Sequence, residues 1–358
     1  MPSPIRTSSE FEAWERLWGE LPEDLRSGAA GVAAQALAEH ALLRDRDGAD
    51  DTLGGLVPAG VREAGVAAVV AHLAREASRQ VLRARYRIHD ERLMRMSDDD
   101  LAPEAVEALR RLRAHAGTDG PERPGDPADA GDLSDPDDPD GIDDPAGPRP
   151  LREIHHRLFV GELLSRAWCD RLLAELSRLR AWVAAEELPA MAPNSMNRYG
   201  VLLDDLGLRP ALDWLTAEVV RPLASAVYPD LGGADLEDCH GFIVEYADDG
   251  DLHLDFHIDD SEVTLNLCLG DGFEGGELYF QGLRCMRHLQ TGCSREDGFQ
   301  YAHVPGQALL HAGKHRHGAH PIRAGRRVNL ILWCRSTSVR SAAPEGTCPE
   351  WCRESRGR

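Results

Sequence analysis

A series of short apolar runs separated by glycine-rich turns fills the C-terminal part of the chain and restricts its fold more than any other feature. The runs cover residues 241–246, 263–269, 276–280, 308–311 and 327–333. Their lengths and their apolar composition are typical of strands, and no stretch of helical periodicity lies between them. Strands connected in this way form an antiparallel sandwich or jelly roll, so we expect a β-core over residues 240–338.

Two amphipathic segments before the strands are expected to brace this core. Residues 165–186 and 211–226 place leucine, valine and tryptophan at helical spacing. Helices of this kind commonly cover one face of a sheet. The sequence therefore predicts an α+β domain, with a helical support segment over residues 151–239 and a polar tail over residues 339–358 that covers the surface.

The remainder of the chain divides into a helical region over residues 1–116 and a linker over residues 117–150. Apolar residues recur at helical spacing in 11–18, 61–93 and 103–115. The linker is rich in Asp, Pro and Gly and has almost nothing apolar to bury, which is typical of acidic disordered segments. We expect an accessory helical region joined to the α+β domain, with docking or oligomerisation as a hypothesis for its role.

Charge and composition exclude several classes of function. The chain has 358 residues, 42% hydrophobic residues and a formal net charge of −21. So acidic a balance argues against a nucleic-acid-binding surface, which needs a basic footprint. The sequence has neither the apolar run of a secretory signal at its start nor one long enough to span a membrane. We therefore expect a cytoplasmic protein without a membrane or nucleic-acid partner.

The eight cysteines are interpreted as reduced thiols, in keeping with that compartment. Cys285, Cys293, Cys348 and Cys352 could together form a zinc cluster. Their spacings, with seven and three intervening residues, differ from those of common zinc knuckles. Inert thiols are the preferred interpretation, and whether the cysteines bind zinc stays open.

The chemistry of the β-core centres on a His-x-Asp pair near its beginning. In a strand, side chains at positions i and i+2 project from the same face, so His257 and Asp259 can hold one ion from one side. His253 and Asp255 form the same pattern four residues earlier. One further histidine would complete two imidazoles and one carboxylate, which is the facial triad of non-haem Fe(II) oxygenases.

Candidates for that further histidine lie near the end of the core. They are His311, His315, His317 and His320. Arg327 follows them and is a fixed cation suited to bidentate capture of a carboxylate. If the strands alternate regularly, Tyr246 and Asn266 point into the same core, where either could hydrogen-bond a bound acid or serve in packing.

Several phrases of the core resemble the prolyl 4-hydroxylase-type Fe(II)/2-oxoglutarate dioxygenases. They are Tyr246 and residues 275–278, 317–322 and 325–327. A closer resemblance is to the family called 2-oxoglutarate and iron-dependent oxygenase domain-containing protein 2 and its plant relatives. It is carried by residues 193–200, 257–266, 303–307 and 328–336. The resemblance covers about residues 151–353 and leaves out the N-terminal helices.

The resemblance implies a double-stranded β-helix that binds Fe(II) through His257, Asp259 and His317, with no catalytic side chain beyond these ligands. It favours His257 over His253 because the matching phrase continues through residues 260–264. It favours His317 over its neighbours because of its distance from the proline and the arginine that follow. Arg327 would then pair with the distal carboxylate of 2-oxoglutarate, and Tyr246 and Asn266 are further candidate contacts to this cosubstrate.

The implied reaction consumes O₂ and 2-oxoglutarate and releases succinate and CO₂ while an unactivated C–H bond is hydroxylated. L-ascorbate is implied as a reductant, and the substrate is expected to be a peptide side chain or a small metabolite. Asn197, Arg198 and Tyr199 are candidates for the substrate mouth, with a structural turn as the alternative. The rival functions are a non-haem iron enzyme that does not use 2-oxoglutarate, and a catalytically silent binding module. The substrate and the oligomeric state are not revealed by the sequence.

Overall fold

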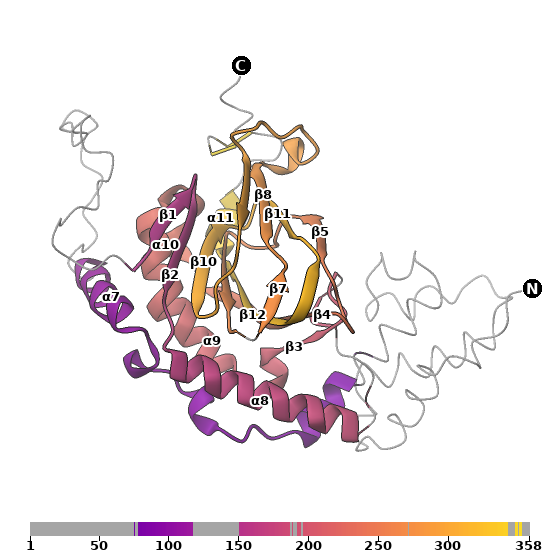
Figure 1. Ribbon diagram of the computed structural model, residues 1–358. Coiled ribbons are helices and arrows are strands. Elements are labelled where there is room, and N and C mark those ends of the chain that lie inside the picture. The colour runs from indigo at the N-terminus through magenta and orange to yellow at the C-terminus, as the bar shows by residue number, and fades with distance from the viewer. Residues whose placement is uncertain are drawn as a thin grey trace, which may run out of the picture. The chain divides into compact units, whose positions relative to one another are not determined.

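The computed structural model describes residues 75, 78–116, 150–186, 188, 192–194, 196–270, 272–342, 348–349 and 351–352 (Figure 1). The chain divides into two compact units, one formed by Met1–Glu91 with Leu173–Leu208 and the other by Arg92–Leu172 with Arg209–Arg358. The helix predicted at residues 11–18, and all of the predicted linker except its last residue, lie outside the described residues. The domain boundaries drawn from the sequence stay predictions.

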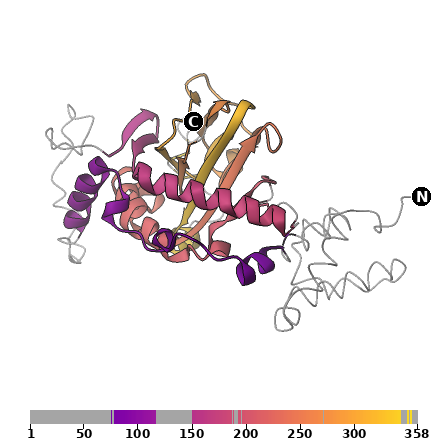
Figure 2. The same ribbon diagram turned by 60° about the horizontal axis from the view of Figure 1, so that its bottom comes forward.

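The larger sheet of the second unit is antiparallel throughout. Its strands run in the order β1 (Arg152–His155), β2 (Leu158–Glu162), β10 (Gln307–Ala312), β6 (Val263–Cys268), β12 (Ile322–Arg335) and β4 (Asp238–Ala247). Figure 2 shows β12 as the long yellow strand of this sheet. The short strand β7 (Phe273–Gly275) pairs with the first half of β12. Residues 273–275 lie between two of the predicted strands, and their backbone groups pair with those of β12.

A smaller antiparallel sheet faces the larger one. Its strands run in the order β5 (Leu254–His257), β11 (His315–Ala319), β8 (Leu278–Leu283) and β9 (Gly298–Tyr301). Two antiparallel sheets packed on each other form the jelly roll that the sequence predicted, and with the helices of the same unit they confirm the α+β class.

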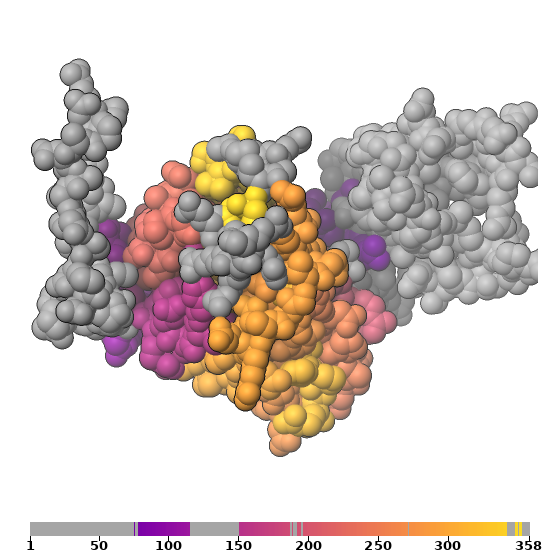
Figure 3. Space-filling view, turned by 90° about the horizontal axis from the view of Figure 1, so that it is seen from above, coloured from indigo at the N-terminus to yellow at the C-terminus, as the bar shows by residue number. Residues whose placement is uncertain are grey.

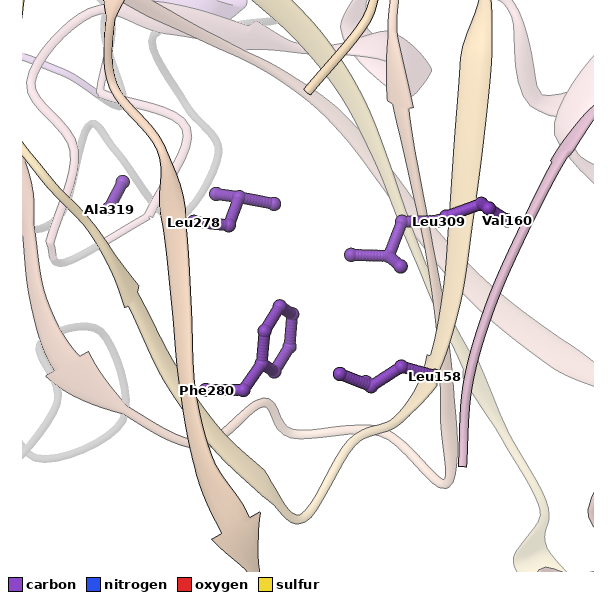
Figure 4. Close-up of a cluster of buried hydrophobic side chains, with 6 residues drawn as sticks. All are labelled: Leu158, Val160, Leu278, Phe280, Leu309 and Ala319. Atoms are coloured by element: carbon purple, nitrogen blue, oxygen red, sulfur yellow. The ribbon is translucent and has the colours of Figure 1, made fainter. Parts of the chain in front are cut away.

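Side chains from both sheets meet in the core between them. The cluster consists of Leu158 and Val160 from β2, Leu309 from β10, Leu278 and Phe280 from β8, and Ala319 from β11 (Figure 4). Phe280 is only 1% exposed, so truncating it to alanine would cost about 3–5 kcal/mol. This core fixes the spacing of the two sheets and therefore the positions of the polar side chains that share their inner faces.

Helices cover the larger sheet on its other face. The segment predicted as a helix at residues 211–226 consists of α9 (Arg209–Leu215), the π-turn η5 (Thr216–Val220) and α10 (Arg221–Val227). Pro222 has no N–H to offer the carbonyl of Glu218, and the guanidinium of Arg113 donates to that carbonyl instead at 2.7 and 3.1 Å. Gly241 of β4 leaves room for the side chain of Leu212, which would lie 2.5 Å from a Cβ there.

The remaining elements of the second unit are short, apart from the predicted helix after residue 102. They are η3 (Asp98–Asp100), α7 (Pro103–Ala116), η6 (Pro229–Leu231), η7 (Gly233–Asp235), η8 (Met286–His288) and α11 (Thr337–Ala342). In the tail predicted as a polar surface cover, residues 339–342 form the end of α11 and Cys352 is completely buried. The cysteine neighbours of Cys352 explain this difference and are considered below.

The first unit contains the second half of α8 (Arg166–Ala185), the strand β3 (Gly200–Leu202) and the 3₁₀ turn η4 (Leu203–Leu206). The helix predicted to reach residue 93 ends at residue 85, and η2 (Glu91–Met94) follows. The buried carboxylate of Glu175 accepts hydrogen bonds from the Tyr86 hydroxyl at 2.6 Å and from the backbone N–H of His89 at 3.1 Å. The bond from the His89 N–H replaces the one that this group would make in a continuing helix. None of the helices in the described part of the chain is both long and apolar enough to cross a lipid bilayer.

Candidate metal centre

His257, Asp259 and His317 converge between the two sheets. His257 ends β5, Asp259 follows two residues later, and His317 of β11 lies opposite His257 in the strand register. The Nε2 atoms of His257 and His317 lie 3.5 and 3.8 Å from Oδ1 of Asp259. All three ligand atoms lie within 4.8 Å of one another. Two imidazoles and one carboxylate are therefore within reach of a single ion.

Hydrogen bonds to the backbone orient both imidazoles. Nδ1 of His257 lies 2.8 Å from the carbonyl oxygen of Asp255, and Nδ1 of His317 lies 2.8 Å from that of His315. A carbonyl can only accept, so each Nδ1 carries the proton. The lone pair of each Nε2 then faces the carboxylate, which is the tautomer that a metal ligand requires.

The Asp259 carboxylate is held by the neighbouring strand. Its Oδ2 accepts a hydrogen bond from the Thr264 hydroxyl of β6 at 2.7 Å, and that hydroxyl lies 2.8 Å from the hydroxyl of Ser261. Oδ1, on the side of the two imidazoles, is left for an ion. The backbone N–H of Asp259 donates to the carbonyl of Gly313 at 2.8 Å, which anchors the loop itself.

Burial and mutual proximity set the protonation of the three groups. Burial alone would raise the pKa of the Asp259 carboxyl, but the imidazoles of His317, His257 and His311 hold it below its ordinary value. Burial, together with the nearby His257, lowers the pKa of His317 to about 3. For His257 the effect of burial is outweighed by the hydrogen bond to Asp259, so its pKa is raised. Near neutral pH two of the groups are in their ligand form, and a proton competes with a metal mainly at His257.

The rival pair His253 and Asp255 lies in a different environment. Their side chains approach to 3.4 Å but are 53% and 96% exposed. No second histidine joins them in any cluster of potential ligands within the residues that the structure covers. His253 instead borders a cavity beside the smaller sheet.

The rivals of His317 also occupy other places. Nε2 of His311 is 3.8 Å from Oδ2 of Asp259, too far for a hydrogen bond, and its ring packs 4.7 Å from that of His317. His315 is buried against Phe280, and His320 lies 3.3 Å from the amide of Gln300. The geometry thus groups the residues that the resemblance implied, and their role as metal ligands stays a prediction.

Arg327 is a buried cation on the inner face of the larger sheet. It is 1% exposed, its guanidinium lies 4.5 Å from the ring centre of Tyr246, and it donates a hydrogen bond to the carbonyl of Gly276. Gly276 has a φ of +69°, and a Cβ there would come within 3.0 Å of the guanidinium. Glycine is therefore needed at that position both for the backbone conformation and for the space. Burial lowers the pKa of Arg327, although Tyr246 offsets part of this effect.

A row of polar side chains connects Arg327 with the three converging residues. Thr264 and Asn266 are two residues apart in β6, so their side chains share one face of the strand. The hydroxyl of Thr264 donates to Asp259 at one end of this row. Oδ1 of Asn266 accepts a hydrogen bond from Asn329 at 2.6 Å, and Asn329 lies two residues after Arg327 on β12. Asn266 and Tyr246, both predicted to face the core, are buried there.

The sequence interpretation gave no role to Asn329, His303 or Thr264. Nδ2 of Asn329 lies 3.1 Å from Nδ1 of His303, whose other ring nitrogen lies 3.1 Å from the carbonyl of Gln307. Burial, with the charge of Arg327 nearby, lowers the pKa of His303 to about 3 and keeps it neutral. Strand alternation from Asn266 and Arg327 could have identified Thr264 and Asn329, whereas His303 lies outside any strand.

Asn197, Arg198 and Tyr199 belong to the other unit. The backbone N–H of Asn197 donates to the side-chain oxygen of Asn194 at 2.7 Å, and Arg198 lies 5.7 Å from the ring centre of Tyr199. The hydrogen bond from Asn197 is that of a side-chain-stabilised turn, the alternative that the sequence offered. Their role at a substrate mouth stays a prediction.

The residues present fit both groups that the resemblance implied. Two imidazoles and a carboxylate are donors suited to Fe(II). Nε of Arg327 is buried without a hydrogen-bond partner, and no carboxylate lies within ion-pair distance of this side chain in the described ranges. A buried cation without a counter-anion is costly, so a bound dicarboxylate would supply a partner that the described residues do not.

The fold, the three converging residues and the buried arginine together resemble proteins of the 2-oxoglutarate- and iron-dependent oxygenase type. Comparison with known sequences confirms that resemblance. Residues 148–233 match the family described as OGFOD2-like domain. A protein of Arabidopsis thaliana named 2-oxoglutarate and iron-dependent oxygenase domain-containing protein CP2 is 46% identical over 198 residues, which are 55% of this chain and 50% of the relative. The human 2-oxoglutarate and iron-dependent oxygenase domain-containing protein 2 is 39% identical over 199 residues, 55% of this chain and 53% of the relative.

The chain spans about half the length of the curated relatives that it matches. Among solved structures, a prolyl-4-hydroxylase of Pseudomonas putida is 19% identical with a TM-score of 0.37, over 51% of this chain and 93% of that one. AviO1 from Streptomyces viridochromogenes is 17% identical with a TM-score of 0.39, over 54% of this chain and 94% of AviO1.

Proposed function

We propose that the chain is an Fe(II)- and 2-oxoglutarate-dependent dioxygenase that hydroxylates an unactivated C–H bond and releases succinate and CO₂. The observation that carries the proposal is the pairing of two features inside one β-core. The ligand atoms of His257, Asp259 and His317 lie within 4.8 Å of one another, and Arg327 is buried without an anion among the described residues. The names of the curated relatives support the same cofactor and cosubstrate.

Each residue has a defined task in this proposal. Nε2 of His257, Nε2 of His317 and Oδ1 of Asp259 hold the iron, and Thr264 keeps the carboxylate turned toward it. Arg327 would bind the distal carboxylate of 2-oxoglutarate, and its Nε is a donor that is free to do so. Asn266 and Tyr246 line the space between. The iron, when bound, activates O₂ for the oxidation of 2-oxoglutarate and substrate; the protein supplies orientation, charge and exclusion of water.

The substrate in this proposal is a peptide side chain or a small metabolite, and L-ascorbate serves as reductant. Asn197, Arg198 and Tyr199 are proposed to contact the substrate. An active site of this kind sets its specificity by the residues around the iron rather than by the ligands themselves.

The test is anaerobic titration of the purified protein with Fe(II) and then with 2-oxoglutarate, followed by visible absorption. We expect a weak charge-transfer band from the iron–keto acid chelate, and succinate formation once O₂ is admitted. Asp259→Ala should abolish the band and the succinate. The double variant His253→Ala/Asp255→Ala is the matched control, because it removes the neighbouring His-x-Asp pair and should leave both signals unchanged.

Other outcomes would replace the proposal with a specific rival. Iron binding without the band would indicate an iron enzyme that does not use 2-oxoglutarate. Absence of iron binding in a folded protein would indicate a silent binding module. A loss of signal in the His253 and Asp255 control, with retention in Asp259→Ala, would show that the ligand set is wrong.

A further inference from the structure

A second cluster of metal-binding side chains lies beyond the end of β8. Cys285 precedes η8, His288 ends it, and Cys348 and Cys352 come from the C-terminal segment. In Figure 3 the yellow atoms of that segment lie beside the orange atoms of the loop after β8. Nδ1 of His288 lies 3.4, 3.6 and 3.5 Å from the sulfurs of Cys285, Cys348 and Cys352. The sulfurs of Cys285 and Cys348 are 3.9 Å apart.

These separations match the edges of a tetrahedron of zinc ligands. Bonds of about 2.3 Å to sulfur and about 2.0 Å to nitrogen place N···S edges at about 3.5 Å and S···S edges at about 3.8 Å. The observed separations of 3.4 to 3.6 Å and of 3.9 Å agree with both values. Octahedral coordination with the same bonds would need S···S edges of only about 3.3 Å.

A disulfide or ordinary packing explains the cluster less well. A disulfide holds its sulfurs about 2.05 Å apart, whereas all eight cysteines, each in the described part of the chain, are thiols. Cys352 is fully buried and Cys285 is 6% exposed. The backbone N–H of Cys285 donates to the sulfur of Cys352 at 3.4 Å, a contact that stabilises a thiolate.

We propose that Cys285, His288, Cys348 and Cys352 bind one Zn²⁺ ion in a closed structural site. Three thiolates and one imidazole form a complete Cys₃His set and leave no position for a substrate. The sequence interpretation had included Cys293 in place of His288. Cys293 is exposed, and its sulfur contacts the carbonyl of Ser294 at 3.2 Å.

The metal would tie the C-terminal segment to the loop between β8 and β9. That loop already carries the buried ion pair of Arg284 and Asp297 at 2.7 Å. Arg316 of β11 donates to the loop carbonyls of Leu289 at 3.1 Å and Thr291 at 2.6 Å. Cys293 of this loop lines a pocket of about 660 Å³ beside the smaller sheet. Zinc would hold the loop in place, and with it this part of the pocket lining.

The experiment measures metal content of the full chain purified without added metal and dialysed against a chelator. We expect a single zinc ion per chain, retained in Asp259→Ala, because the iron ligands are not involved. Cys348→Ser/Cys352→Ser should lower the zinc content at least about tenfold, since a closed site loses most of its affinity with two ligands removed. Cys293→Ser is the matched control and should retain the metal.

A second measurement does not depend on how the variants fold. Exchange of the wild-type metal for Co²⁺ should give the intense visible bands of a tetrahedral centre with thiolate charge transfer. Wild-type protein without zinc, an equal loss of zinc in Cys293→Ser, or Co²⁺-loaded protein that lacks the thiolate charge-transfer bands would each overturn the proposal. A Cys285–Cys348 disulfide found by mass spectrometry in freshly purified protein would overturn it in favour of a redox pair.

Discussion

Replacing Arg327 with methionine should separate cosubstrate binding from stability. The guanidinium is 1% exposed and has Tyr246 and the carbonyl of Gly276 as neighbours. Methionine has a similar length and no charge, so it can occupy the same space. If Arg327 is present to bind an anion, the variant should fold about as well as the wild type and bind 2-oxoglutarate far more weakly.

The contacts of Arg327 set the expected magnitudes. Its removal loses a buried cation–π contact worth about 2 kcal/mol and a charged hydrogen bond worth about 1.5–3 kcal/mol. It also relieves the desolvation of a buried cation, which costs several kcal/mol. These effects oppose each other, so the free energy of unfolding should change by less than about 2 kcal/mol. Truncating one partner of a buried charge pair costs about 2–5 kcal/mol of binding, which weakens 2-oxoglutarate affinity about 30-fold to about 4,000-fold.

Two measurements on the same protein preparations decide whether Arg327 serves cosubstrate binding or stability. Urea unfolding without ligand gives the stability, and anaerobic titration of the iron-loaded protein gives the dissociation constant of 2-oxoglutarate. Asn329→Ala is a useful comparison, because it removes a neighbouring polar side chain without removing the charge. A loss of more than about 3 kcal/mol of stability with unchanged 2-oxoglutarate affinity would refute the reasoning and make Arg327 a structural residue.

Three further changes test the surroundings of the proposed site. Thr264→Val removes the hydroxyl that donates to Asp259 at 2.7 Å, and it should weaken Fe(II) binding about 10- to 100-fold in a chelator competition while the thermal midpoint changes little. Gly318→Ala should lower stability by about 1–3 kcal/mol and weaken iron binding. The new Cβ would lie 2.7 Å from the backbone oxygen of Leu254 and push β11 away from β5. An iron affinity equal to that of the wild type would contradict this prediction. Asp297→Asn breaks the buried pair with Arg284 and should cost about 3 kcal/mol in urea unfolding at neutral pH, whereas Asp230→Asn, in a half-exposed pair, should cost less than about 1 kcal/mol. Burial alone would raise the pKa of Asp297, but its hydrogen bonds to Arg284 and Ser294 hold the pKa below the ordinary value. The stability of the wild type over Asp297→Asn should therefore be complete above about pH 4 and shrink as the pH falls further. A stability difference that does not change with pH would contradict a charged Asp297.

The apolar strands could be predicted from the sequence because their composition alone specifies them. Residues 263–269 correspond to β6, and residues 308–311 lie within β10. The strands β5, β9 and β11 were not predicted, since their histidines, arginine, glutamine and glycines do not read as strand formers. In β5 and β11 these polar residues include His257 and His317, which converge on the site. The residue types that the proposed site needs differ there from the usual strand pattern.

Of the two clusters of potential metal ligands, one could be predicted from the sequence more completely than the other. His257 and Asp259 are two residues apart in the chain, so they lie close together although Asp259 is beyond the end of β5, and a resemblance was enough to select His317. The second cluster joins residues 285–288 with residues 348–352, and nothing local requires the tail to return to that loop. Four cysteines were considered, and the histidine three residues after Cys285 was overlooked. Searching for Cys-x₂-His as well as for cysteine pairs would have found it.

The two proposed metal sites should bind their ions independently, although β8 connects them. Phe280 of β8 stacks on His317 with ring centres 5.6 Å apart, and Cys285 follows five residues later, which is about 16 Å along an extended strand. Between these points β8 is paired with β11 on one side and β9 on the other, so a disturbance of the loop is not carried along the strand. Sites this far apart usually contribute additively. Cys348→Ser/Cys352→Ser should therefore lower the thermal midpoint while Fe(II) affinity stays within about threefold of the wild type. A loss of iron affinity as large as that of Thr264→Val would mean that zinc positions His317, and that the cluster belongs to the active site rather than to the loop.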